Sequence, residues 1–347
     1  MKFETPKVPS RLKELLLFGT STIFVAALIH LAGAEKFINA LSQANLVFLI
    51  PAIIFGTSKF LVWSFTWYRV FQKTGIEANY IESVKLQSAG SFLNSITPLG
   101  QAGGEPLMAY IVSSNKDASY EKALSSVISA DILNIIPPFT FVFGGAAYIL
   151  FFHSVTSLIV QAVYIALVVL LFGGLFVYLL WFEAGRIERL VLKTVETVSN
   201  KLGRGEKLVE KFESRLENFE KSIGKMGEDP VYLVKTVLIL HIGFVLEVAS
   251  LALVFMSLGI TPLLSYLYFI LPVADIANTS PTPGGAGTYE AAIAALIVAV
   301  SEAVTGFAGG PIAFHTALLI GILYRLSTYW PGLLIGYIGF NMVQNTK

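Results

Sequence analysis

The stretch NSITPLGQAGGEPLMAY, residues 94–110, decides the fold, because it sets helix breakers and a carboxylate within an otherwise apolar chain. A similar stretch, NTSPTPGGAGTYEAA, occupies residues 278–292. Both fit the pattern T-P-x-G-x-x-x-x-E, and each has an asparagine shortly before it, Asn94 or Asn278. We call these stretches the first and second motif. Their agreement in pattern and in apolar surroundings indicates an internal repeat.

Composition predicts an all-α polytopic membrane protein. The 347 residues are 55% hydrophobic and 14% charged, with a mean hydropathy of +0.70, whereas a soluble domain carries about a quarter charged residues. Apolar runs of roughly 20 residues recur, as a bilayer core of about 30 Å requires. The alternating segments of a transmembrane β-barrel are not seen. A net charge of +1 predicts no nucleic-acid partner, and the lack of cysteine excludes disulfides and thiolate chemistry.

Hydropathy predicts six full spans, over residues 15–32, 46–71, 120–152, 155–182, 231–258 and 311–340. The charged segment 183–229 is expected to form a water-facing helical hairpin. Lysine and arginine near the span ends place both termini of this multi-pass cell-membrane protein in the cytoplasm.

With six spans and both termini in the cytoplasm, the two motif-bearing units cross the membrane in opposite directions. They are therefore inverted relative to each other, as in alternating-access proteins. We therefore divide the chain into an N-terminal span, a first inverted repeat with its motif at 94–106, a fourth span with the cytoplasmic hairpin, and a second inverted repeat with its motif at 278–290. These segments are residues 1–44, 45–152, 153–230 and 231–347.

Pro98 and Pro283 break the helices inside the motifs. An unpaired backbone group in lipid costs several kcal/mol, so each break must be covered by protein or line a wet cavity. We expect each motif to be the tip of a re-entrant helical hairpin, with the two tips meeting in the interior. Pro106 suits the first turn of the helix leaving the first tip. Glu105 and Glu290 fall in or near such first turns, where they either cap the helix dipole or face a cavity to bind a cation, an amine or a proton.

Five ionisable residues fall at membrane depth, where each costs at least about 2.5 kcal/mol unless paired or hydrated: Lys59, Asp131, Glu247, Asp275 and Arg325. Arg325 lies too deep in its predicted span to reach the interface easily. Its guanidinium suits a phosphate or a carboxylate. The alternative is a structural ion pair with Asp131 or Glu290. For Lys59 and Glu247 we expect a structural role.

The motifs resemble the lysylphosphatidylglycerol synthetase transmembrane-domain family of flippase-like proteins. The matching stretches are LNSITPLGQAGGEPLMAYIV, ALSSVISADILNIIPP, PTPGGAGTYEAAI and LYRLSTYWPGLLIG. The resemblance implies an inverted repeat that moves a lipid between leaflets, an aminoacylated phospholipid in the best-understood members and polyprenyl-phosphate carriers in archaeal relatives. Gln101 departs from the basic residue common at its position. The resemblance supports as site residues Pro98, Gly103, Gly104, Glu105, Asp131, Pro283, Gly284, Gly285, Gly287, Glu290 and Arg325.

Three functions follow, in order of preference. The first is translocation of an anionic phospholipid or a polyprenyl-phosphate-linked lipid, with Asn94 and Asn278 among the binding or coupling residues. The second is proton- or sodium-coupled transport of a small solute. The third, a membrane enzyme acting on a lipid, is not expected, because we find no H-E-x-x-H, no metal-ligand cluster and no Ser-His pair at useful spacing. With no soluble aminoacyl-transferase domain in this sequence, we do not expect it to make lysyl-lipid itself. No cofactor is expected, membrane lipids are the expected partners, and a homo-oligomer is left open.

Overall fold

The computed structural model describes residues 34–97, 101–152, 228–280, 282–303 and 309–344, with a few isolated positions elsewhere. The predicted first and fourth spans, Pro98 and almost all of the charged hairpin lie outside the described residues. Within these ranges every regular element is a helix. The fold class is therefore all-helical, as predicted.

Two sets of helices follow the same order along the chain: long, short, break, short, long. The first set is α2 (Leu46–Thr74), α3 (Tyr80–Ile96), α4 (Gln101–Asn115) and α5 (Tyr120–Phe152). The second is α9 (Pro230–Ser257), α10 (Leu264–Asp275), the 3₁₀ turns η1 (Ile276–Thr279) and η2 (Pro283–Gly285), α11 (Thr288–Ala303) and α12 (Phe314–Gln344). The order agrees with the predicted repeat, whereas the inversion, the domain limits and the re-entrant path stay predictions.

The long helices α2, α5, α9 and α12 are each long and apolar enough to cross a membrane. Their ends lie within a few residues of the predicted spans. Local signals fix some ends: Asn45 caps α2 by accepting a hydrogen bond from the Val47 N–H, and Gly75 ends it with a φ of 77°. Hydropathy and capping together thus account for the four described spans.

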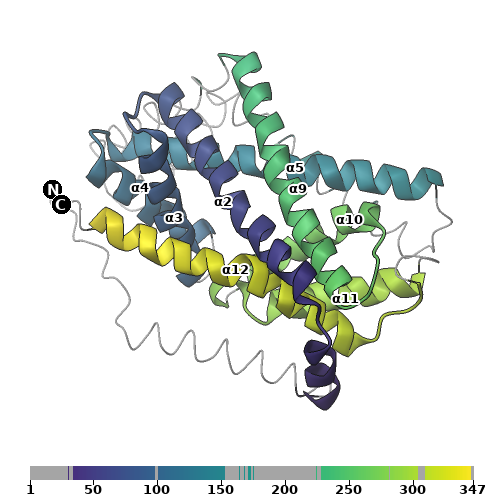
Figure 1. Ribbon diagram of the computed structural model, residues 1–347. Helices are drawn as coiled ribbons and strands as arrows, with labels where there is room; N and C mark the ends of the chain where they lie inside the picture. Colours follow the sequence, from purple (N-terminus) through teal and green to yellow (C-terminus); the bar gives the residue numbers. More distant parts are fainter. Residues whose placement is uncertain are drawn as a thin grey trace, which may run out of the picture.

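The pairs α3/α4 and α10/α11, which we call the first and second short-helix pair, pack against opposite ends of the long helices (Figure 1). The core around the first pair uses the C-terminal parts of α2 and α12 and the N-terminal halves of α5 and α9. Its buried side chains include Trp67, Phe71, Leu93, Met108, Leu133, Leu233 and Val343. The core around the second pair uses the other halves, through Ala52, Val142, Phe255, Leu267, Ile297 and Leu319.

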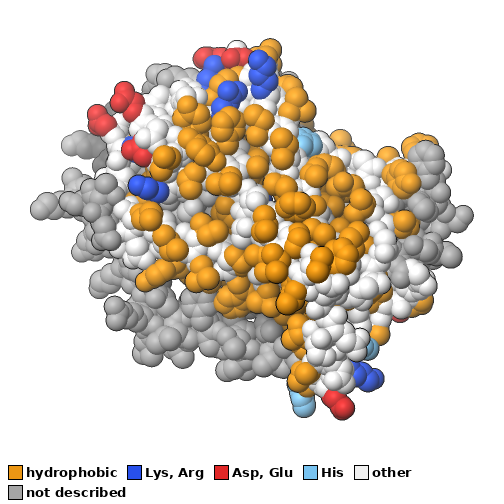
Figure 2. Space-filling model, viewed as in Figure 1, with side chains coloured by type: hydrophobic (Ala, Val, Ile, Leu, Met, Phe, Trp, Pro, Cys, Tyr) orange, Lys and Arg blue, Asp and Glu red, His pale blue; other side chains and the backbone are white. Residues whose placement is uncertain are grey.

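The outer surface of the long helices is apolar. Figure 2 shows hydrophobic side chains across the face that α2, α9 and α12 contribute to, with charged side chains at its edges. Large exposed side chains on these helices include Leu61, Val234, Leu238, Ile242, Leu334 and Ile338. An exposed apolar surface of this kind is stable against lipid chains and not against water.

One local prediction is wrong. Because α4 begins at Gln101, Pro106 lies inside this helix and not in its first turn. The Gly-rich segment is helical, and Gly104 packs directly on Asn94 of α3, where a Cβ atom would overlap the Asn94 side chain. The first break is therefore confined to the few residues between Ile96 and Gln101.

Candidate functional site

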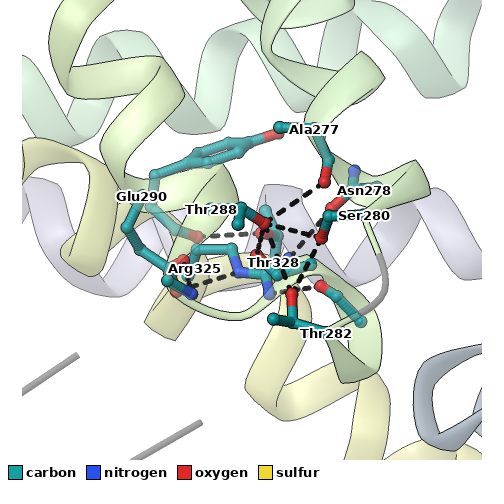
Figure 3. Close-up of polar contacts among 12 residues, drawn as sticks. Ala277, Asn278, Ser280, Thr282, Thr288, Glu290, Arg325 and Thr328 are labelled. Atoms are coloured by element: carbon teal, nitrogen blue, oxygen red, sulfur yellow. Dashed lines mark hydrogen bonds and ion pairs between the residues drawn. The ribbon is translucent and has the colours of Figure 1, made fainter. Parts of the chain in front are cut away.

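The second motif reverses the chain between α10 and α11. Gly284 and Gly285 have φ angles of 56° and 66°, a conformation that residues with a side chain adopt at a cost. The hydroxyls of Ser280, Thr282 and Thr288 form a cluster across the break, with Ser280 Oγ 2.8 Å from Thr282 Oγ1 and 2.7 Å from Thr288 Oγ1 (Figure 3). Thr288 Oγ1 also lies 2.9 Å from the Gly285 carbonyl oxygen and 3.3 Å from that of Ala277, so this hydroxyl can satisfy a carbonyl at the break.

Glu290 lies in the first turn of α11 and uses both carboxylate oxygens. Oε2 accepts a hydrogen bond of 2.7 Å from the Gly287 N–H, and Oε1 lies 3.3 Å from Arg325 Nε. Glu290 therefore caps the helix, as one of its two predicted roles requires. It is also the ion-pair partner of Arg325, one of the two candidates that the sequence offered.

Arg325 is only 5% exposed, and its guanidinium group has several polar and aromatic partners. Nη2 donates a 2.6 Å hydrogen bond to the Gly284 carbonyl, and Nη1 lies 3.5 Å from Asn278 Oδ1 (Figure 3). The guanidinium carbon is 3.8 Å from the ring centre of Tyr329 and 4.9 Å from that of Tyr289. Cation–π contacts add to the ion pair and compensate for the burial of the charge.

Sequence reasoning did not select the two tyrosines. Tyr329 follows Arg325 by four residues and so shares its helix face, and Tyr289 precedes the motif glutamate. Those spacings were available signals, but aromatic residues are common in membrane helices and neither spacing is specific.

A chain of polar side chains extends from this site into the protein. Asn278 Nδ2 donates to Asp275 Oδ1 at 3.2 Å. Asp275 in turn lies within electrostatic range of Lys59 and Glu247, which form an ion pair between α2 and α9. Lys59 also lies 4.7 Å from the ring centre of Trp63. The expected structural role of the Lys59–Glu247 pair stays a prediction, although the contact between them now gives it a physical basis.

The second motif also contacts the helix that leads into the first. The turn η2 packs on α3, and the Tyr329 hydroxyl is a hydrogen-bond partner of Ser95, next to Asn94. A Cβ atom on Gly284 would overlap that same hydroxyl. Tyr329 therefore touches both Arg325 and the end of α3.

The predicted residues of the first motif form a second group around the start of α4. Asn94 packs on Gly104, and Glu105 lies close enough to Asp131 for their charges to interact. Asp131 is thus beside a carboxylate and is not the ion-pair partner of Arg325. Gly103 lies in α4. In the second motif, the predicted residues Gly285 and Asn278 pack directly on each other.

Comparison with known proteins identifies relatives along almost the entire chain. The profile of the lysylphosphatidylglycerol synthase TM region matches residues 15–336. The UPF0104 membrane protein PH1989 of Pyrococcus horikoshii is 25% identical over 342 residues, which cover 97% of this chain and 98% of that protein. The UPF0104 membrane protein MJ1595 of Methanocaldococcus jannaschii is 23% identical, with 96% and 95% covered. A UPF0104 membrane protein of Methanothermobacter thermautotrophicus is 24% identical, with 80% and 83% covered. The chain therefore belongs to the lysylphosphatidylglycerol synthase transmembrane-region family of integral membrane proteins.

Proposed function

We propose that this protein moves a lipid with a phosphate in its headgroup, an anionic phospholipid or a polyprenyl-phosphate-linked lipid, between the leaflets of the cell membrane. Arg325 and the N-terminus of α11 would hold the phosphate while the lipid tails stay in the bilayer. The observation that carries the proposal is the buried guanidinium at a helix break within a membrane protein.

The donors around Glu290 are those that a phosphate would use. Its carboxylate takes the Gly287 N–H at the start of α11 and the Nε–H of Arg325. A backbone N–H at a helix N-terminus and an arginine fork both favour the binding of anions such as phosphate. Glu290 therefore acts as an internal anion, and a phosphate would compete with it for Arg325.

Access to the site requires movement of the second motif, because Arg325 and Glu290 are 5% and 3% exposed. The residues that would move are those of the break, whose backbone is held by hydroxyl side chains and not by continuous helix. The packing of the two short-helix pairs at opposite ends of the long helices supports an alternating-access cycle, in which each pair opens towards one leaflet.

Leaflet exchange in liposomes tests the proposal. The purified protein is reconstituted with trace fluorescent phosphatidylglycerol or a fluorescent polyprenyl phosphate, and the outer-leaflet label is quenched with dithionite. We expect quenching beyond the outer-leaflet half with either lipid, and no such effect with a fluorescent glucosylceramide, which has no phosphate. If no phosphate-bearing lipid exchanges faster than in protein-free liposomes, the proposal fails. Uptake of a soluble solute driven by a sodium or proton gradient would instead favour a secondary transporter.

A further inference from the structure

Three buried oxygen atoms near the first motif have no hydrogen-bond partner in the described part of the chain. They are Oδ1 of Asn94, Oδ2 of Asp131 and Oδ1 of Asn134. Leaving a buried acceptor unsatisfied costs about 1–3 kcal/mol, so native proteins seldom keep several together without a ligand. All three atoms are acceptors, which indicates that the missing partner is a donor or a cation.

Two of these atoms lie on α5, and the third lies where α3 packs on α4. Asp131 and Asn134 are three residues apart and so share one face of α5. Asn94 packs on Gly104 of α4, and the next residue, Glu105, interacts electrostatically with Asp131. Because α4 packs on α5, Glu105, Asp131 and Asn134 border one region, whereas Asn94 lies at the contact of α3 with α4.

No described basic residue neutralises this region. The charge that acts on Asp131 is that of Glu105, whereas the lysines at the end of α4 and the start of α5 have other partners. Lys116 pairs with Glu82, and Lys122 donates to the Gly75 carbonyl. The C-terminal end of α3, at Ile96, adds backbone carbonyls and the negative end of its dipole. The region is thus rich in acceptor oxygens.

We infer that Glu105 of the first motif forms a binding site for Na⁺ together with Asp131 and Asn134 of α5. Hard cations prefer carboxylate and amide oxygens, and broken membrane helices commonly supply such oxygens. No three His, Cys, Asp or Glu side chains gather as a metal site among the described residues, so a monovalent ion fits better than a transition metal. The inference goes beyond lipid movement and does not depend on it. It gives the two motifs opposite chemistry, with an acceptor site in the first and a donor site around Arg325 in the second.

Ion-dependent stability and direct binding test this site. Thermal unfolding of the full chain in detergent is followed in NaCl, KCl and choline chloride at equal ionic strength, together with equilibrium binding of ²²Na⁺. We expect a saturable rise in Tm with Na⁺ relative to choline, and saturable ²²Na⁺ binding. Two variants, Asp131→Asn and Asn134→Leu, should lose both signals. Their Tm values in choline chloride are compared with that of the wild type to establish that they fold.

Asn115→Leu is the matched control, because Asn115 bonds the Ile111 carbonyl at the far end of α4; it should keep both signals. Identical Tm values for the wild type in NaCl and choline chloride, with no ²²Na⁺ bound, would overturn the inference. A Na⁺ effect that persists unchanged in Asp131→Asn and Asn134→Leu would also overturn it. Stabilisation by methylammonium but not by Na⁺ would reassign the site to an amine and refute the sodium assignment.

Discussion

Arg325 of α12 and Glu290 of α11 form an ion pair of 3.3 Å at the point where the second motif resumes its helix. Both side chains are almost completely buried. The pair joins the last long helix to the tip of the second short-helix pair, so the charge that we assign to lipid binding also holds the break in place.

Breaking this pair from one side should be costly. Glu290→Gln leaves the guanidinium without its counter-ion, and we expect a loss of about 3–5 kcal/mol in the free energy of unfolding. The double variant Glu290→Gln/Arg325→Met should lose less than the sum of the two single variants, because neither charge is then left alone. A double-mutant cycle from denaturant unfolding in detergent measures this coupling. Additive losses would mean that the pair contributes nothing as a pair.

The Lys59–Glu247 pair between α2 and α9 gives a second, independent cycle. Each single change to methionine should destabilise the protein by about 3–5 kcal/mol, whereas Lys59→Met/Glu247→Met should be near wild type, since a buried pair can be replaced by apolar residues of similar volume. Lipid exchange by the double variant separates the two roles. Normal exchange agrees with a structural role, and lost exchange in a stable protein shows a functional one.

Gly284 should not tolerate a side chain. Alanine there would be strained at a φ of 56° and would overlap the Tyr329 hydroxyl, pushing that ring away from Arg325. Gly309→Ala is the matched control, since Gly309 has a φ of 79° but no atom within 4 Å of the added Cβ. We expect Gly309→Ala to cost roughly 1–2 kcal/mol from backbone strain and Gly284→Ala to cost more. Equal Tm losses in the two variants would show that the Tyr329 contact is not tight.

Glu82, at the start of α3, offers a prediction for pH. Its hydrogen bond and ion pair with Lys116 lower its pKa below the ordinary value of 4.5. A lowered pKa stabilises the fold at a pH above the ordinary value, and this contribution disappears as the pH falls through the lowered value. The Tm difference between wild type and Glu82→Gln should therefore be present at pH 7 and shrink below pH 4.5. The effect should be small because the Glu82 side chain is 40% exposed, so water screens its ion pair. A difference that grows on acidification would contradict this account.

The sequence was sufficient for the four spans that the structure describes and for the repeated order of helices. Hydropathy over windows of bilayer length depends only on local composition, and α2, α5, α9 and α12 accordingly begin and end close to the predicted limits. The repeat was visible because both breaks need the same helix-disrupting residues at the same spacing from a glutamate.

Contacts between distant helices were only partly predictable. Burying a charge in the membrane costs free energy, so each deep charge requires a partner. This argument left two candidate carboxylates for Arg325, Asp131 and Glu290, and the structure pairs it with Glu290. The cost of burying a charge also singled out Lys59 and Glu247, but it did not predict that they pair with each other. That contact depends on how α2 packs against α9. The start of α4 was misjudged because glycines were taken as helix breakers, whereas Gly103 and Gly104 lie inside the helix, with Gly104 packed on Asn94.

The most direct test of the central claim is lipid exchange by variants of Arg325 in liposomes. Arg325→Gln should slow the exchange of phosphatidylglycerol by about tenfold to a hundredfold, the rate equivalent of about 1.5–3 kcal/mol for a lost charged hydrogen bond. Arg325→Lys, which keeps the charge but not the planar fork, should be intermediate. Arg69→Gln is the control, because Arg69 also stacks on a tyrosine, 3.5 Å from the ring centre of Tyr232, but lies outside the site. Wild-type exchange by a folded Arg325→Gln protein would contradict the assignment of Arg325 as the phosphate-binding residue.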